Sequence, residues 1–126
     1  MASLKDLTNE QKYSVYIFME EYDKSINGNH YIDPLFFYTR YGVSFNNVKK
    51  FRDSIKEDER FSYAISILKE VQNERLFGIL LDDCYRMLAD MMKFIGSERY
   101  TEEYSKLLEL FKKEFGYDHA PISECF

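Results

Sequence analysis

The sequence of 126 residues predicts an all-α fold, a single-domain bundle of about five helices. Apolar residues recur at steps of three and four along most of the chain, which is the spacing of one helical face. Four of the five glycines stand where such stretches end, and capping residues stand where they begin. No stretch has the alternating pattern of a strand. We therefore expect one helical domain over residues 1–116 and an extended or disordered tail over residues 117–126.

The first half of the chain predicts one long helix and two short ones. Thr8 and Gln11 have the spacing of a capping box, which starts a helix from about Asn9 to Ile26. Asp33 can cap the next helix, Gly42 can end it in the left-handed conformation, and Ser44 can cap a further one. Residues 33–56 thus predict a helix-turn-helix-like unit. Its apolar positions, which would pack against a third helix, are Phe37, Tyr41, Val43, Val48 and Phe51.

After this unit the sequence predicts a third long helix, which Gly96 ends, and then a last helix. The carboxylates of Glu57–Glu59 stand where a long helix would begin, with an apolar stripe from Phe61 to Val71. A second apolar stripe, Phe77 to Ile95, has heptad-like spacing and contains Gly78, which indicates a kink or a close approach by another helix. The last helix is expected from Thr101 to Gly116. The second stripe is either ordinary core or an oligomer seam made of Phe77, Leu81, Leu88, Met91 and Ile95.

The charges predict a local basic face on an acidic body. The formal net charge of −5 argues against a surface that attracts nucleic acid everywhere. Between Tyr38 and Lys56, however, five basic residues stand against Asp53 alone. The acidic excess lies in other parts of the chain.

We find no motif for catalysis, for a metal or for a cofactor, and we expect none of the three. The two histidines stand far apart in expected loops. The three aspartates of the Phe77 to Ile95 stretch could hold magnesium, but we interpret them as solvated charge, and we interpret the cysteine there as an inert core residue. The side chains weighed for these roles are His30, His119, Asp82, Asp83, Asp90 and Cys84.

The cysteines and the hydropathy predict a cytoplasmic protein without contact to a membrane. Cys84 and Cys125 cannot make a disulfide framework, and Cys125 stands too near the end for a prenylation box. The first residues contain no apolar run of signal-peptide length, and no charge-free segment is long enough to span a bilayer.

The function that the residues favour is binding of double-stranded DNA by the second helix of the 33–56 unit. Lysine and arginine side chains meet phosphates, and asparagine can pair with adenine through two hydrogen bonds. The alternative is an ordinary helical hairpin with a solvated polar side. Tyr38, one turn before Gly42, is expected to lean inward and to widen the crossing of the two helices. The candidate DNA contacts are Arg40, Ser44, Asn46, Asn47, Lys49, Lys50 and Arg52.

The stretch LFFYTRYGVSFNNVKKFRDSIKEDERFSYAISILKEVQNERLFGILL resembles the small terminase subunits of tailed phages, over about Pro34 to Leu81. The shared features are a short helix, a glycine turn, a helix with an aromatic residue and a basic patch, and a charged break before a long helix. The resemblance implies a non-catalytic, homo-oligomeric ring in the host cytoplasm. Such a ring would bind viral DNA at a packaging site and hand it to a large terminase subunit with ATPase and nuclease activity. It implies Lys49, Lys50 and Arg52 as DNA contacts.

Two other functions stay open. The acidic pairs and the many tyrosines suit a small protein-binding module, such as an immunity protein, inhibitor or adaptor, that neutralises a basic partner. A dimeric helix-turn-helix regulator would share the DNA-binding unit and would read two half-sites roughly 34 Å apart. A native mass of many copies would favour the packaging interpretation, and a monomer would favour the acidic module.

Overall fold

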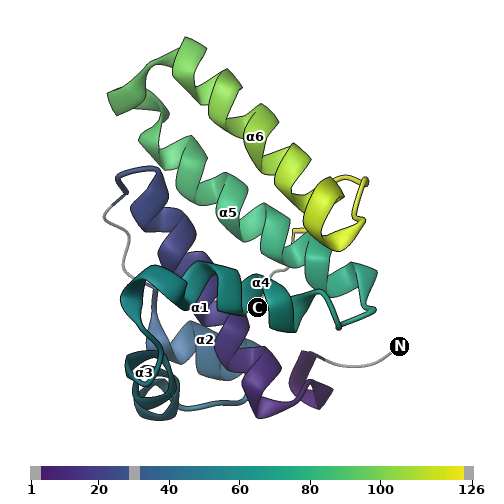
Figure 1. Ribbon diagram of the computed structural model, residues 1–126. Coiled ribbons are helices and arrows are strands. Elements are labelled where there is room, and N and C mark those ends of the chain that lie inside the picture. Colours follow the sequence, from purple (N-terminus) through teal and green to yellow (C-terminus); the bar gives the residue numbers. More distant parts are fainter. Residues whose placement is uncertain (1–3, 29–31, 124–126) are drawn as a thin grey trace. The chain divides into compact units, whose positions relative to one another are not determined.

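The computed structural model describes residues 4–28 and 32–123, and every regular element within them is helical (Figure 1). The all-α expectation is therefore confirmed. The expectations for His30 and Cys125 lie outside the described residues. Among the described helices, none combines the length and the apolar character needed to cross a bilayer. In order, the elements are the 3-10 helix η1 (Leu4–Asp6), α1 (Asn9–Ser25), α2 (Pro34–Tyr41), α3 (Phe45–Asp53), the 3-10 helix η2 (Glu57–Glu59), α4 (Arg60–Leu68), α5 (Glu74–Ile95) and α6 (Ser97–Phe115).

The chain divides into two compact units. The first consists of Met1–Glu21 and Tyr31–Val71, and the second consists of Tyr22–His30 and Gln72–Phe126. Residues 9–21 of α1 belong to the first unit, and residues 22–25 belong to the second. The expectation of one domain over residues 1–116 stays a prediction.

A capping box starts α1, as the sequence predicts. The Thr8 N–H donates to Gln11 Oε1 at 2.9 Å, and the Gln11 N–H donates to Thr8 Oγ1 at 3.1 Å. The two bonds satisfy amide groups that the first turn of a helix leaves without an intrahelical partner. The helix ends at Ser25, one residue before the expected Ile26.

Three residues join α2 to α3, and each of the predicted turn signals is confirmed. Asp33 Oδ1 accepts a hydrogen bond of 3.0 Å from an amide of the first turn of α2. Gly42 has a φ of 77°, in the left-handed region that glycine adopts at no steric cost, and its N–H donates to the last turn at 2.7 Å. Ser44 Oγ accepts from the Asn47 N–H at 3.4 Å and caps α3. Local chemistry therefore fixes where α3 begins.

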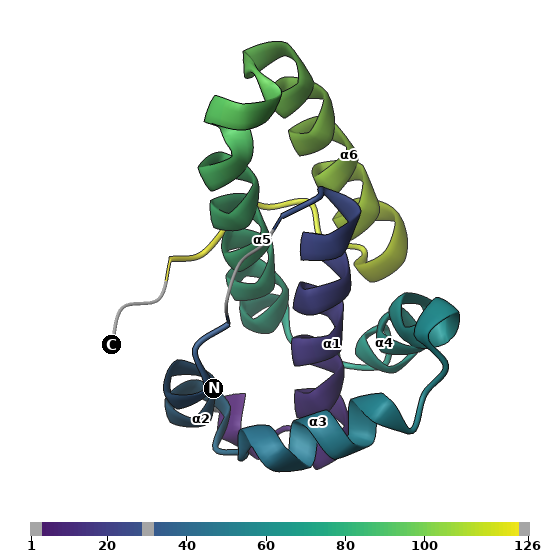
Figure 2. The ribbon, with the colours of Figure 1, turned by 90° about the vertical axis from the view of Figure 1, so that its left-hand side faces the viewer.

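Aromatic rings build the core of the first unit around α1. Tyr16 meets Phe37 of α2 and Phe45 of α3 edge-on, with ring centroids 5.5 and 5.6 Å apart. Figure 2 shows α3 crossing the N-terminal part of α1. The ring centroid of Phe18 on α1 lies 5.1 Å from that of Phe61 on α4. The predicted core positions are confirmed, since Phe37, Tyr41, Val43 and Val48 are buried and Phe51 is half-buried.

Two further helix boundaries differ from the prediction. The acidic run Glu57–Glu59 forms one 3-10 turn and α4 has only nine residues, so the long helix expected there is wrong. Asn73 begins the next helix instead, because its Oδ1 accepts from an amide of the first turn of α5 at 3.2 Å. Helix α6 begins at Ser97, one turn before the expected Thr101, because Gly96 caps both α5 and α6.

In the second unit, α5 and α6 lie side by side as an antiparallel pair (Figures 1 and 2). Phe77 of α5 stacks on Phe115 of α6, with centroids 4.8 Å apart and ring planes within 5°. Cys84 is buried in this unit. Burial, and secondarily the neighbouring Asp83, raise the pKa of the Cys84 thiol. A thiol with a raised pKa is a poor nucleophile, which fits a core role for Cys84.

Candidate functional site

Helix α3 presents a polar face to solvent. Asn46, Asn47, Lys49 and Lys50 are exposed, whereas Val48 between them is buried. The 3.6-residue period of a helix places the four polar side chains away from the buried side. Within the described part of the chain, neither lysine makes a hydrogen bond or ion pair. The two ammonium groups are therefore available to an external anion.

Arg52 differs from the exposed residues of this face, because carboxylates of the first unit hold its guanidinium group. Its Nη1 donates to Glu20 Oε2 of α1 at 2.7 Å, and its Nε donates to Asp53 Oδ1 at 3.2 Å. The Tyr16 hydroxyl donates to the same Glu20 oxygen at 3.3 Å. The side chains of Arg52 and Glu20 are 17% and 19% exposed. The expectation that Arg52 projects from α3 is thus corrected, because a carboxylate of α1 holds it inward.

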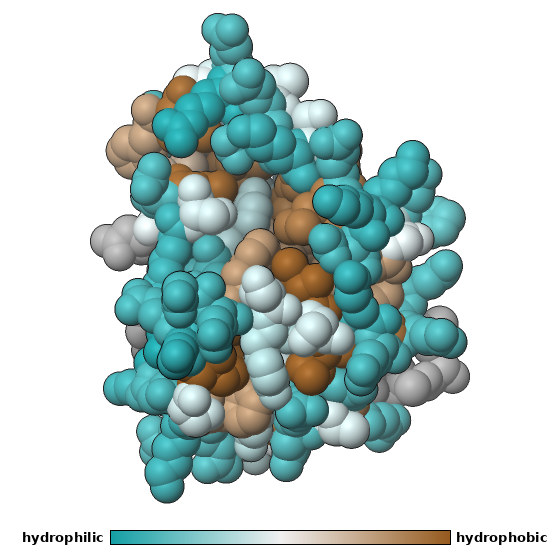
Figure 3. Space-filling model, viewed as in Figure 1, coloured by the Kyte–Doolittle hydropathy of each residue, from teal (hydrophilic) through white to brown (hydrophobic). Residues whose placement is uncertain are grey.

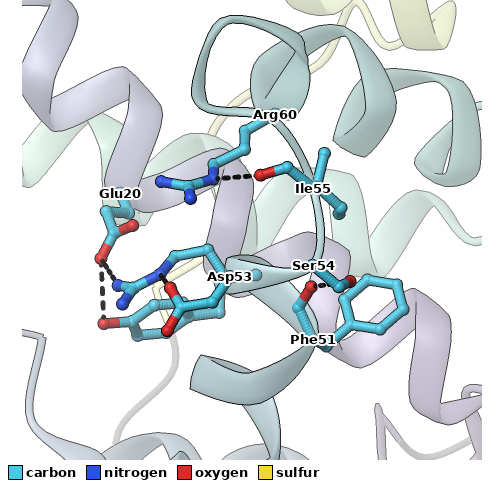
Figure 4. Close-up of polar contacts among 8 residues, drawn as sticks. Glu20, Phe51, Asp53, Ser54, Ile55 and Arg60 are labelled. Carbon is cyan, nitrogen blue, oxygen red and sulfur yellow. Dashed lines mark hydrogen bonds and ion pairs between the residues drawn. The ribbon is translucent and has the colours of Figure 1, made fainter.

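The two carboxylates also shift the pKa of the guanidinium. Burial lowers the pKa of Arg52, but the carboxylates of Glu20 and Asp53 raise it by more, so the net direction is upward. The segment after α3 is fixed as well, since Arg60 Nε donates to the Ile55 carbonyl at 3.0 Å (Figure 4). These contacts hold α3 in place against α1 and α4.

Arg40 is also turned inward and leaves the candidate interface. Its side chain is 5% exposed, and its guanidinium carbon lies 4.3 Å from the centroid of the Phe36 ring. A cation over a ring face is attracted by the ring quadrupole. Ser44 is exposed, but its hydroxyl caps α3. Of the seven candidate DNA contacts, the structure therefore brings four onto one open face, Asn46, Asn47, Lys49 and Lys50.

Exposed apolar side chains on α2 form a surface that the sequence reasoning missed. Leu35 is 71% exposed and Tyr38 is 56% exposed, and Phe36 lies beside them. We call these three residues the α2 apolar patch. The expectation that Tyr38 leans inward is wrong, because Phe37 and Tyr41 occupy the inner side of α2. That signal was present in the sequence, since buried positions 37 and 41 place 35 and 38 outward.

The predicted oligomer seam divides into two parts. Phe77, Leu81 and Leu88 are buried in the second unit, as the core interpretation describes, whereas Met91 and Ile95 are half-buried. The seam stays a prediction for the latter two. Next to them, Met92 and Phe94 are exposed, and Figure 3 shows apolar colour where α5 turns into α6. Along α5 the five seam residues thus change from buried to half-buried.

A second group of lysines lies on α6, around a hollow of about 630 Å³. Carboxylates accompany two of these lysines. Lys106 Nζ lies 3.5 Å from Glu103 Oε1, and Lys112 Nζ lies 4.0 Å from Asp118 Oδ2. The hollow is thus less basic than its lysine count suggests. Its lining residues are Lys106, Glu109, Leu110, Lys112 and Lys113.

The acidic residues of α5 do not form a metal site in the described structure. Within residues 4–28 and 32–123, no three His, Cys, Asp or Glu side chains are placed to hold a metal ion. Asp82 instead accepts a hydrogen bond of 2.8 Å from Arg86 Nε, one turn along the helix. His119 Nε2 lies 3.9 Å from Glu74 Oε1, at the surface of the second unit.

Comparison of the chain with protein-family models, with curated proteins and with solved structures gave no match. Function is therefore inferred from the geometry of the exposed surfaces, and above all from the polar face of α3.

Proposed function

We propose that this chain is a non-catalytic protein that binds double-stranded DNA through α3. The observation that carries the proposal is the exposed face on which Asn46, Asn47, Lys49 and Lys50 stand together. In this proposal α2, the Gly42 turn and α3 act as a helix-turn-helix-like unit, with α3 in the major groove. The lysines contact phosphates, and the asparagines contact base edges near the start of the helix.

The small number of open lysines sets the expected strength of binding. Two phosphate contacts give one copy a weak, salt-sensitive affinity, and the net charge of −5 reduces it further. Several copies that act together on one DNA molecule would overcome this weakness. The resemblance to small terminase subunits supports such an assembly. We therefore propose a recognition subunit of viral DNA packaging that delivers DNA to a large terminase subunit.

Two double variants, each of which removes two positive charges, test the interface. The first is Lys49→Ala with Lys50→Ala, and the matched control is Lys112→Ala with Lys113→Ala on α6. Binding to a labelled DNA duplex is measured by fluorescence anisotropy over a range of salt concentrations. Each lost phosphate contact reduces the magnitude of the negative slope of log affinity against log salt by about 0.9. The slope of the α3 variant should therefore be about 1.8 smaller in magnitude than that of the wild type. The control should keep the wild-type slope.

Two results would remove α3 from the proposal. One is an α3 variant with the affinity and salt slope of the wild type. The other is a loss of binding in the α6 variant alone, which would assign the DNA contact to the lysines around the α6 hollow. Asn46→Ala with Asn47→Ala adds a test of base reading, since it should reduce sequence preference and leave the salt slope unchanged.

A second candidate function, a protein-binding module, is favoured by the α2 apolar patch. Large apolar side chains that stand together at a surface mark interaction sites more often than isolated ones do. Leu35 and Tyr38 are of the size and exposure that anchor an interface. In this function the chain would act as an immunity protein, inhibitor or adaptor, and its partner would contact α2.

A further inference from the structure

A further basic residue of the first unit lies at the turn between α2 and α3. It is Lys5 of η1, which stands far from the 33–56 unit in the sequence and is absent from the candidate DNA contacts. A Cβ built on Gly42 would lie 3.6 Å from Lys5 Cγ and 3.8 Å from Lys5 Cδ, and both are ordinary van der Waals distances. The aliphatic stem of Lys5 therefore lies against the turn that leads into α3.

The residue before Lys5 keeps it in this place. Leu4 is 4% exposed and anchors η1, which packs against α2. Lys5 itself is exposed. A lysine that lays its methylene groups on the protein surface keeps its ammonium group in water. Because the stem already contacts the turn, less side-chain freedom is lost when the ammonium group binds an external anion.

The position of the turn relative to α3 gives Lys5 a role in DNA binding. Gly42 stands three residues before Phe45, the first residue of α3. When a recognition helix lies in the major groove, its N-terminal residues contact base edges, and cations beside it meet the phosphates of the flanking strands. An ammonium group has three N–H donors, so Lys5 can bind a phosphate oxygen while it keeps a contact within the chain.

We propose that Lys5 is a third phosphate contact of the DNA interface, beside the N-terminal end of α3. This inference rests on the proposed function, because it takes α3 as the DNA-binding helix. The interface then includes η1 as well as the 33–56 unit. Three phosphate contacts predict a slope of log affinity against log salt of about −2.7 for one copy, compared with about −1.8 for Lys49 and Lys50 alone.

The variant Lys5→Met tests this contact, because methionine keeps an apolar stem against the turn and removes the charge. The matched control is Lys69→Met, which removes one positive charge from an exposed position after α4 in the same unit. Binding to a labelled DNA duplex is measured by fluorescence anisotropy over a range of salt concentrations. The wild type and the double variant Lys49→Ala with Lys50→Ala are measured beside them. Thermal unfolding verifies that each variant is folded, and Lys5→Gln replaces Lys5→Met if the methionine variant does not fold.

The slope of Lys5→Met should be about 0.9 smaller in magnitude than that of the wild type, and Lys69→Met should keep the wild-type slope. Lys5→Arg, which keeps the charge, should also keep it. A wild-type slope in Lys5→Met, together with a reduced slope in the α3 double variant, would overturn the role of Lys5 and leave the α3 interface in place.

Two other results would also overturn the inference. Equal reductions in Lys5→Met and Lys69→Met would show that the effect comes from the net charge and not from a contact. A wild-type slope in the α3 double variant, or a wild type that binds no duplex DNA, would overturn the proposed function and the role of Lys5 with it.

Discussion

Arg52 on α3 and Glu20 on α1 stand 32 residues apart in the chain, yet their charged groups meet at 2.7 Å. This pair fastens α3 to α1 and removes one arginine from the outer face of α3. The same helix therefore carries a structural cation on its inner side and two open cations, Lys49 and Lys50, on its outer side. Substitution of Arg52 should therefore change the stability of the first unit, whereas substitution of Lys49 and Lys50 should change DNA binding.

Arg52→Ala should destabilise the first unit. The change leaves the Glu20 carboxylate mostly buried without its cation, and a charged hydrogen bond of this kind contributes about 1–3 kcal/mol. Urea unfolding followed by circular dichroism measures the loss. Lys49→Ala with Lys50→Ala is the control, because exposed substitutions usually change stability by less than about 0.5 kcal/mol. A loss no larger than that of the control would show that the pair contributes nothing.

Arg52→Ala should leave the salt dependence of DNA binding unchanged wherever the variant is folded. The guanidinium is engaged by Glu20 and Asp53 and does not contact phosphate in the proposed complex. Anisotropy titrations at a temperature well below the unfolding midpoint separate affinity from stability. If the slope of log affinity against log salt became smaller in magnitude by about 0.9, Arg52 would belong among the phosphate contacts.

Asn73→Ala should weaken α5 at its start. The side chain accepts a hydrogen bond of 3.2 Å from the Leu76 N–H, and loss of an N-cap typically costs about 1 kcal/mol. Asn73→Asp should restore most of the stability, because aspartate is an equally good N-cap. Thermal unfolding of the two variants gives the comparison. If both lose the same amount, the side chain has a role other than capping.

Tyr63 should make stability depend on pH in strongly alkaline solution. Burial, and then its hydrogen bond of 2.6 Å to Glu10, raise the pKa of the Tyr63 phenol to about 12 from an ordinary value near 10. The unfolded chain then loses this proton first, so the contribution of Tyr63 to stability is complete below pH 10 and is lost as the pH rises to about 12. Unfolding curves of the wild type and Tyr63→Phe should therefore differ most below pH 10 and converge near pH 12. A constant difference over that range would contradict the raised pKa.

Leu35→Ser with Tyr38→Ser should reduce association of the chain with itself or with a partner, at little cost in stability. Both side chains are largely exposed, so their removal uncovers no core. Light scattering on a sizing column gives the native mass of the wild type and of the variant over a range of concentrations. An unchanged mass in a chain that does self-associate would exclude the α2 apolar patch as the contact between copies.

The sequence predicted those parts of the fold that depend on near neighbours. The capping box of Thr8 and Gln11 and the turn from Gly42 to Ser44 use residues at most three positions apart, so their geometry follows from their order. The exposure of Asn46 and Lys50 followed from helical periodicity in the same way. The start of α6 was missed, because one residue, Gly96, serves two helices.

Contacts between distant residues could not be predicted in this way. Nothing near Arg52 in the sequence indicates that a carboxylate on α1 will hold it inward. The role of Gly78 depends on Ile122, since a Cβ at position 78 would lie 2.6 Å from Ile122 Cγ1. Ile122 lies in a stretch without periodicity, so the sequence showed the need for a close approach but not that the chain after α6, rather than another helix, makes it. The inward position of Arg40 likewise depends on the packing of α2 as a whole, including the Phe36 ring.

The most direct test of the proposed interface is the response of backbone amide resonances to added duplex DNA. DNA binding through α3 predicts that the largest chemical-shift changes map to residues 46–50, with small changes around the α6 hollow. The absence of any change at saturating DNA would contradict DNA binding itself. Changes concentrated between Lys106 and Lys113 would contradict the assignment of α3 as the DNA-binding helix.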